Sequence, residues 1–163
     1  MTQILPRGYA EAPELQVSQW FNCDAAITLE SLRGQVVLLH AFQMLCPGCV
    51  SIGTPQARRA HRLFGGSGLK VIGLHTVFEH HAAMTPVSLA AFIHEYRLSF
   101  PIGVDAHTES QPIPLTMQRY GFQGTPSTVL IDREGRIRYH QFGQKDDLVL
   151  GMAIGTLLNE AQG

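Results

Sequence analysis

Cys46 and Cys49, two cysteines separated by two residues, are the side chains in this sequence best suited to chemistry. A thiol pair at this spacing can form and exchange a disulfide, or it can supply half of a metal site. A structural zinc site would need two further ligands, and no second Cys-x-x-Cys pair or matching histidine spacing is present. The pair therefore favours redox chemistry with no metal and no cofactor, against the alternative of two unreactive buried cysteines.

The residues around Cys46 place it at the start of a helix. An apolar, β-rich run at 36–42 precedes it and is typical of a strand buried on both faces, and a helical pattern follows. Pro47 suits the first helical position, because no N–H donor is needed there. The free N–H groups of Gly48 and Cys49 can then point at the Cys46 sulfur, and with the helix dipole they should lower the pKa of its thiol.

This asymmetry assigns different roles to the two thiols. We expect Cys46 to attack a disulfide and Cys49, one helical turn away, to resolve the mixed disulfide. Cys49 must first lose its proton, and a buried neighbouring base would help. His40, six residues before Cys46, would stay neutral in a dry environment and is our candidate for that base. The alternative is a core histidine bonded to one main-chain carbonyl.

Alternating strand-like and helix-like patterns predict one α/β domain with a central sheet and helices on both faces. The domain is expected over residues 20–163, after an extended arm over residues 1–19 that lacks clear periodicity. The last helix is apolar at Leu148, Met152, Ile154, Leu157 and Leu158. The expected strands are 36–42, 69–77, 100–104, 128–131 and 137–142, and the expected helices are 46–64, 86–97, 115–120 and 145–160.

Three stretches, in this order, resemble the TlpA/ResA-like (redoxin, AhpC/TSA) branch of the thioredoxin-like superfamily: 32–39, Cys46-Pro47-Gly48-Cys49 and 124–132. The resemblance implies a thioredoxin-like fold with a mixed sheet and a thiol–disulfide oxidoreductase acting on a protein disulfide or dithiol. It also implies an upstream redox partner, either a reductase or a low-molecular-weight thiol. Pro126 would be a cis-proline facing the cysteines, and the Thr125 main chain would bind a substrate segment as an added strand. Alternatively, Thr125-Pro126 simply starts a strand.

The sequence departs from this branch around the cysteines. Leu45 stands where an aromatic residue is common, and with Pro47 and Gly48 it would form part of the surface that a substrate meets. Pro55 lies nine residues after Cys46, where eight is common. One extra residue in this turn predicts a local bulge or a helix break.

Two other functions remain open for this fold. Peroxiredoxins share it, but their nucleophile usually follows a Thr three residues earlier, where this chain has Gln43. Copper chaperones share it too, but they typically space their cysteines by three residues rather than two. Both stay alternatives to disulfide exchange, and the direction of electron flow is left open.

Composition narrows the partners and the location. The net charge is −1, so electrostatics gives no case for nucleic acid or an anionic membrane as a partner. No run approaches the roughly 18 apolar residues of a membrane-spanning helix, and the N-terminus has no secretory pattern. We therefore expect a cytoplasmic monomer. His80 and His81, which follow the expected strand 69–77 that carries His75, are interpreted as parts of a solvated loop rather than a metal site. Cys23 is interpreted as a quiet apolar residue.

Overall fold

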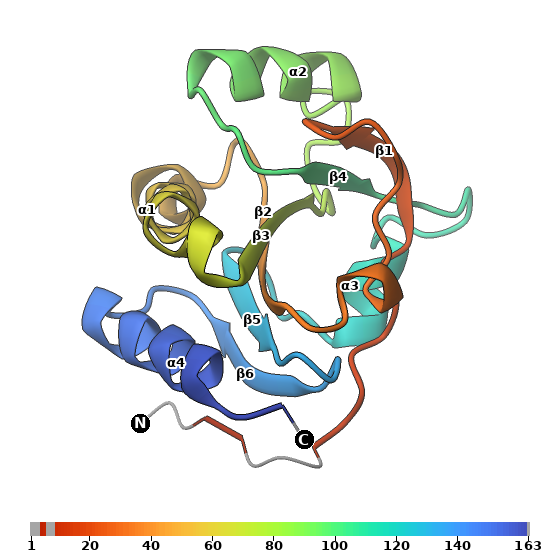
Figure 1. Ribbon diagram of the computed structural model, residues 1–163. Coiled ribbons are helices and arrows are strands. Elements are labelled where there is room, and N and C mark those ends of the chain that lie inside the picture. Colours follow the sequence, from red (N-terminus) through yellow and green to blue (C-terminus); the bar gives the residue numbers. More distant parts are fainter. Residues whose placement is uncertain (1–3, 6–8, 163) are drawn as a thin grey trace.

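Six strands form one mixed sheet in the computed structural model, which describes residues 4–5 and 9–162 (Figure 1). The order across the sheet is β1-β4-β3-β2-β5-β6. Strands β2, β3 and β4 run parallel, whereas β1, β5 and β6 each pair antiparallel with their neighbours. The strands are β1 (Val17–Phe21), β2 (Val36–Phe42), β3 (Leu69–His75), β4 (Ile102–Asp105), β5 (Ser127–Ile131) and β6 (Ile137–Phe142).

Helices cover both faces of this sheet, as the sequence predicts. One buried cluster joins the sheet to α1 (Thr54–Phe64), α2 (Pro86–Glu95) and α4 (Asp147–Asn159). A second cluster joins the opposite face to α3 (Leu115–Tyr120) and to the 3₁₀ turn η1 (Glu30–Leu32). Figure 1 shows α1 and α4 on one side of the sheet and α3 on the other. Within the described part of the chain, no helix combines the length and apolar character needed to cross a membrane.

Strand β2 lies in the middle of the sheet and sets the position of the cysteines. All seven of its residues are buried, because helices and loops cover both of its faces, and a continuous apolar run is the pattern that such a strand requires. His40 is the polar member of this strand. Cys46 follows the carboxyl end of β2, the edge at which ligands and chemistry gather in open α/β sheets.

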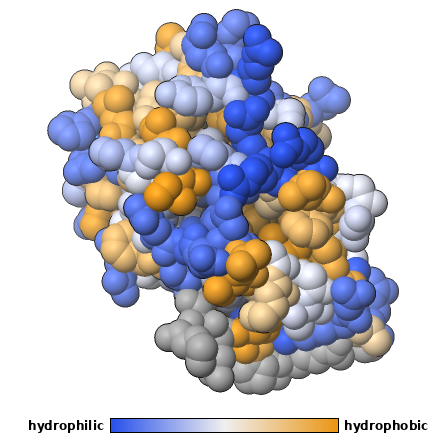
Figure 2. Space-filling model, turned by 90° about the vertical axis from the view of Figure 1, so that its left-hand side faces the viewer, coloured by the Kyte–Doolittle hydropathy of each residue, from blue (hydrophilic) through white to orange (hydrophobic). Residues whose placement is uncertain are grey.

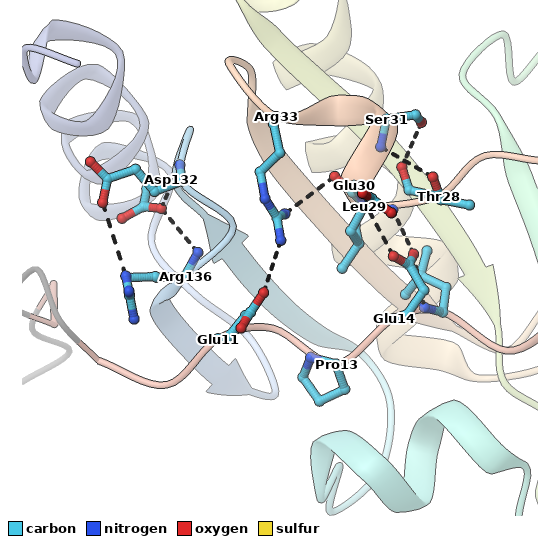
Figure 3. A network of polar contacts seen from close by, with 12 residues as sticks. Glu11, Pro13, Glu14, Thr28, Leu29, Glu30, Ser31, Arg33, Asp132 and Arg136 are labelled. Atoms are coloured by element: carbon cyan, nitrogen blue, oxygen red, sulfur yellow. Dashed lines mark hydrogen bonds and ion pairs between the residues drawn. The ribbon is translucent and has the colours of Figure 1, made fainter. Parts of the chain in front are cut away.

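The segment before β1 packs along the domain, as Figure 3 shows. The Glu14 carboxylate accepts the main-chain N–H of Leu29 at 2.5 Å, and Glu11 pairs with Arg33 at 3.1 Å. Leu15 is buried in the same region. Strand β1 begins two residues before the expected end of the arm, whose residues 1–3 and 6–8 lie outside the described part. The division at residue 19 stays a prediction.

One detail of the last helix corrects the sequence interpretation. Leu148 and Met152 were expected on its apolar face, but both are exposed. Ile154 and Leu157 are buried as expected, and Leu150 and Ala153 are buried with them. Apolar residues surround most of this helix, so periodicity alone cannot select the buried face.

Candidate active site

Cys46 occupies the residue before the first helical turn. The main chain is helical from Pro47, and the Cys46 sulfur accepts the N–H of Cys49 at 3.3 Å. The Cys46 carbonyl accepts the N–H of Val50 at 3.0 Å, which begins the helical hydrogen-bonding pattern. The structure therefore places Cys46 where the sequence predicts it, with a free helix N–H directed at its sulfur. The side chain is partly exposed, so a partner's disulfide can reach it.

A cis peptide bond between Thr125 and Pro126 lies beside this sulfur. The Cys46 thiol donates to the Thr125 carbonyl at 3.4 Å. Pro126 also lies close to the active-site helix: a β-carbon added to Gly48 would be 3.5 Å from Cδ of the Pro126 ring. The resemblance implied both the cis bond and its position opposite the cysteines, and the structure has both.

The turn between Cys49 and α1 contains the extra residue that the position of Pro55 indicated. Cys49–Gly53 forms a π-helical turn, and Pro55 lies in the first turn of α1, where its missing N–H is tolerated. A π turn is the usual way for a helix to absorb one inserted residue. A β-carbon on Gly53 would lie 2.9 Å from His40 Cε1 and 3.0 Å from Pro126 Cβ. The glycine thus lets strand, helix and cis-proline pack closely.

Cys49 is completely buried behind Cys46. Burial raises the pKa of the Cys49 thiol to about 12, and its hydrogen bond with Cys46 adds to the increase. Hydrogen bonds from the Gln43 main chain and the Thr125 side chain partly oppose this shift. Cys49 is therefore held as a neutral thiol in the reduced protein, and its reaction requires that its proton be removed.

His40 is buried in the same region, 1% exposed. Its Nε2 lies 3.0 Å from Thr54 Oγ1, and its ring stacks parallel to that of Phe42 at 5.2 Å. Burial lowers the pKa of His40 to about 3, with the nearby charge of Lys145 contributing. The histidine is neutral, as expected, but a group with so low a pKa is also a weak base. Its role toward Cys49 stays a prediction.

Lys145 is a site residue that the sequence interpretation missed. It is 7% exposed and lies just before α4, with its Nζ donating to the Gly143 carbonyl at 3.3 Å. Burial lowers the pKa of Lys145 to about 8, and the Cys49 thiolate would act in the opposite direction. Lys145 thus interacts electrostatically with both Cys49 and His40. No local pattern marks it, because a lysine beside a helix-capping aspartate normally faces water.

Gln43 is a second buried residue whose place the sequence did not predict. Its amide nitrogen donates to Thr125 Oγ1 at 3.4 Å, and its amide oxygen accepts the N–H of Phe78 at 3.2 Å. Its carbonyl accepts the N–H of Cys46 at 3.1 Å. Gln43 therefore ties the end of β2 to the cis-proline loop. A glutamine directly after an apolar strand is the sequence signal that could have indicated this role, because an amide buried there needs hydrogen-bond partners.

The remaining candidates lie outside this centre. His75 lies on β3, within the expected strand 69–77. It is buried, and its Nε2 accepts the N–H of Met44 at 3.2 Å. In the described residues, no group of three or more His, Cys, Asp or Glu side chains is placed to hold a metal. Leu45 is 55% exposed beside Cys46. Cys23 is a free, partly buried cysteine in the loop after β1.

Comparison with known proteins agrees with this geometry. The model of the AhpC/TSA family matches residues 10–140. A crystal structure of a thioredoxin-like superfamily protein shares 53% identity, covering 94% of this chain and 99% of that one with a TM-score of 0.91. A thiol-disulfide isomerase from Corynebacterium glutamicum also shares 53% identity, covering 92% and 98% with a TM-score of 0.87.

Curated relatives are more distant. Protein DipZ of Mycobacterium bovis is 31% identical over 93% of this chain, which spans 21% of DipZ. The thiol-disulfide oxidoreductase ResA of Halalkalibacterium halodurans is 26% identical over 76% of this chain, with 64% of ResA covered. The chain thus spans only about a fifth of DipZ and less than two thirds of ResA. From the extent of the family match and the paired motifs, the chain belongs to the AhpC/TSA family, in the TlpA/ResA-like branch of the thioredoxin-like superfamily.

Proposed function

We propose that this chain is a thiol–disulfide oxidoreductase that exchanges disulfides with a protein partner through Cys46 and Cys49. One observation carries the proposal: a partly exposed Cys46 sulfur at a helix start accepts a helix N–H and contacts the Thr125 carbonyl, while Cys49 is buried behind it. An accessible nucleophile with a protected resolving thiol is the arrangement that exchange requires. Relatives named thiol-disulfide oxidoreductase and thiol-disulfide isomerase support the same reaction class.

In the reducing direction the Cys46 thiolate attacks one sulfur of the partner's disulfide. A mixed disulfide forms, and the first sulfur of the partner leaves as a thiolate and takes up a proton. Cys49, once deprotonated, attacks the Cys46 sulfur, which forms the Cys46–Cys49 disulfide and releases the partner's second thiolate. Two electrons pass from the dithiol to the partner, and the reverse sequence of steps oxidises a partner dithiol. The reduction potential decides the direction.

The partner would bind along the cis-proline loop. Thr125 and Pro126 lie beside the Cys46 sulfur, so the Thr125 main chain is placed to pair with an extended segment next to the reacting atoms. Leu45, Pro47 and Gly48 form the adjoining part of the proposed surface, and the exposed Leu45 offers apolar contact without the stacking that an aromatic residue would give.

The buried groups beside Cys49 would handle its proton. His40 was the candidate from the sequence, and Lys145 is the alternative that the structure adds. A base accepts a proton more readily as its pKa approaches that of the donor. The pKa of Lys145, about 8, is closer to that of Cys49 than is the pKa of His40, about 3. We therefore favour Lys145 as the acceptor, with neutral His40 packed beside it.

Reduction of insulin disulfides by dithiothreitol tests the proposal. The protein should accelerate the reaction, Cys46→Ala should abolish the acceleration, and Cys49→Ala should trap a mixed disulfide. Cys23→Ala is the matched control and should keep the rate of the original protein. A Cys49→Ala variant that traps nothing, together with rapid peroxide consumption by the original protein, would instead support a peroxidase. Gln43 argues against a peroxidase, because it stands where peroxiredoxins usually have a threonine and its amide is engaged by Thr125 Oγ1 and the Phe78 N–H.

Three further parts of the proposal rest on the sequence. A reductase or a low-molecular-weight thiol would restore the redox state of Cys46 and Cys49 after each cycle. The chain would act as a monomer, which sedimentation measures directly. Its location would be cytoplasmic, and fractionation of cells with detection of this chain tests that location.

A further inference from the structure

A cavity of about 800 Å³ lies between α1, the start of β3 and the segment that follows α2. Its wall includes Gln35, the residue before the first residue of β2, whereas Cys46 lies beyond the last. The seven residues of β2, about 23 Å of extended chain at 3.3 Å per residue, separate Gln35 from Cys46, whereas Pro55 on the same wall is two residues from Gly53. None of the lining residues is Cys46, Cys49, Thr125 or Pro126, so the cavity does not include the site of disulfide exchange.

Positive charge dominates the wall of this cavity. Five of the chain's twelve Lys and Arg residues line it, together with His61, and none of its lining residues is an Asp or Glu. Figure 2 views the side on which α1 and α4 lie and shows strongly hydrophilic side chains running across that face. The five cations are Arg58, Arg59, Arg62, Lys70 and Arg97.

Most of these cations have no acidic neighbour. Arg59 pairs with Asp147, but among the described residues no carboxylate lies within ion-pair distance of the other four. Three cations elsewhere have such partners, in the ion pairs Arg33–Glu11, Arg136–Glu134 and Arg138–Glu160. A chain with net charge −1 has enough carboxylates to neutralise this wall, yet among the described residues only Arg59 of the five cations has one as a partner.

The main chain at Arg97 adds an independent observation. Arg97 follows α2 with φ of 51°, and the N–H groups of Arg97 and Leu98 close the helix on His94 and Ile93. Glycine is the usual residue at this position of a helix end, and a residue with a β-carbon is disfavoured there by roughly 1 kcal/mol. Arginine in this strained position directs attention to its side chain, which lines the cavity.

We propose that this cavity binds a small polyanion, a molecule that carries two or more phosphate or carboxylate groups. Guanidinium groups bind both kinds of anion in a bidentate manner, and several cations on one concave wall repel one another until an anion neutralises them. The volume falls within the range of about 300–1,000 Å³ that small-molecule sites occupy. The concave shape favours a small ligand over an acidic protein surface. The proposal does not depend on the redox activity.

Isothermal titration calorimetry at low salt tests the site, with orthophosphate, pyrophosphate, tripolyphosphate and citrate as probes. Tripolyphosphate or citrate should bind at least tenfold more tightly than orthophosphate, and the stronger of the two identifies phosphate or carboxylate as the preferred group. Arg62→Glu and Arg97→Gly should each weaken binding at least tenfold. Arg97→Gly also relieves the main-chain strain, so loss of binding in a variant that melts no lower cannot be attributed to unfolding.

Arg119→Glu is the matched control, because Arg119 is an exposed arginine of α3 on the opposite side of the sheet. It should change the dissociation constant less than twofold. Equal weakening by Arg119→Glu and Arg62→Glu would show unspecific attraction and overturn the site. Absence of heat with all four probes would overturn it as well. Poly-glutamate is titrated in the same way, and its binding when none of the four small anions binds would show a surface for acidic proteins instead. Insulin reduction by Arg62→Glu should match that of the original protein, which separates failure of this site from failure of the proposed redox function.

Discussion

Gly53 packs directly against Pro126, so closely that a β-carbon on the glycine would lie 3.0 Å from the β-carbon of the proline. The same β-carbon would lie 2.9 Å from His40 Cε1. The π turn that contains Gly53 thus joins the buried strand to the cis-proline loop at a point where no side chain fits. This contact positions the loop against the helix that carries both cysteines.

We expect Gly53→Ala to disturb both stability and exchange. The added methyl group must displace the His40 ring or the Pro126 ring, and overpacking of this kind costs about 1–3 kcal/mol of unfolding free energy. Insulin reduction should slow because the Thr125 carbonyl moves relative to Cys46. Gly151→Ala in α4 is the control: a β-carbon added there would have nothing within 4 Å, and the variant should gain about 0.5–1 kcal/mol of unfolding free energy. A Gly53→Ala variant as stable and active as the original would contradict this account.

Local patterns were sufficient to predict the strand and the helix start, and the resemblance to a family was needed to predict the bulge. The run at 36–42 is wholly apolar apart from His40, so its burial on both faces follows from composition. Proline and glycine after Cys46 predict a helix start from their own main-chain preferences. The position of Pro55, one residue later than is common in the family it resembles, predicted a local bulge or a helix break, and the structure has a π turn there.

Features that depend on distant contacts were not predictable in the same way. Whether Lys145 faces water or the Cys49 thiol depends on how the β6–α4 connection packs on the helix after β2. The basic cavity combines residues from α1, β3 and the segment after α2, which no spacing rule connects. The buried face of α4 was ambiguous for a different reason, since apolar residues surround most of that helix.

Replacing Lys145 with methionine should change the pH dependence of exchange. The amine that accepts the Cys49 proton would be lost, and with it the positive charge that the amine then carries beside the thiolate. The thiolate would form less readily, and the rising limb of the rate profile would move to higher pH. At pH 7 we expect resolution of the mixed disulfide to slow by about two- to tenfold, a loss near 1 kcal/mol. Stopped-flow release of the partner from the mixed disulfide at several pH values measures this step.

Two variants make the result specific. Lys70→Met changes the chain's other lysine, which lies at the basic cavity, and should leave the profile unchanged. His40→Asn tests the alternative acceptor. If His40→Asn shifts the profile and Lys145→Met does not, the histidine assignment is right and the lysine assignment is wrong.

Acid should destabilise the protein through His75. Burial lowers its pKa to about 4 from the usual 6.5, so between these values the unfolded chain binds a proton that the folded protein does not. The free energy of unfolding should therefore fall as pH decreases from 6.5 to 4, by at most roughly 3 kcal/mol from this residue. His40, with its pKa lowered to about 3, acts in the same direction.

Urea unfolding at half-unit steps of pH measures this slope. His75→Gln keeps an acceptor for the Met44 N–H without titrating, so it should reduce the slope by about one proton's contribution. His94→Gln, at a histidine whose side chain is 86% exposed, is the control and should leave the slope unchanged. Equal slopes for the original protein and His75→Gln would show that His75 does not cause the acid sensitivity.

Glu14 and Glu11 provide a matched pair that tests whether the segment before β1 is part of the domain. Glu14 accepts the N–H groups of Leu29 and Glu30, so Glu14→Ala leaves main-chain donors unpaired and should cost about 1–2 kcal/mol in urea unfolding. Glu11 forms an exposed ion pair with Arg33, so Glu11→Ala should cost less than about 1 kcal/mol. Added salt screens this pair and should make the stability of Glu11→Ala equal to that of the original chain. If residues 1–19 were a dispensable arm, both variants would unfold at the same urea concentration as the original chain, and the functional domain would begin at residue 20.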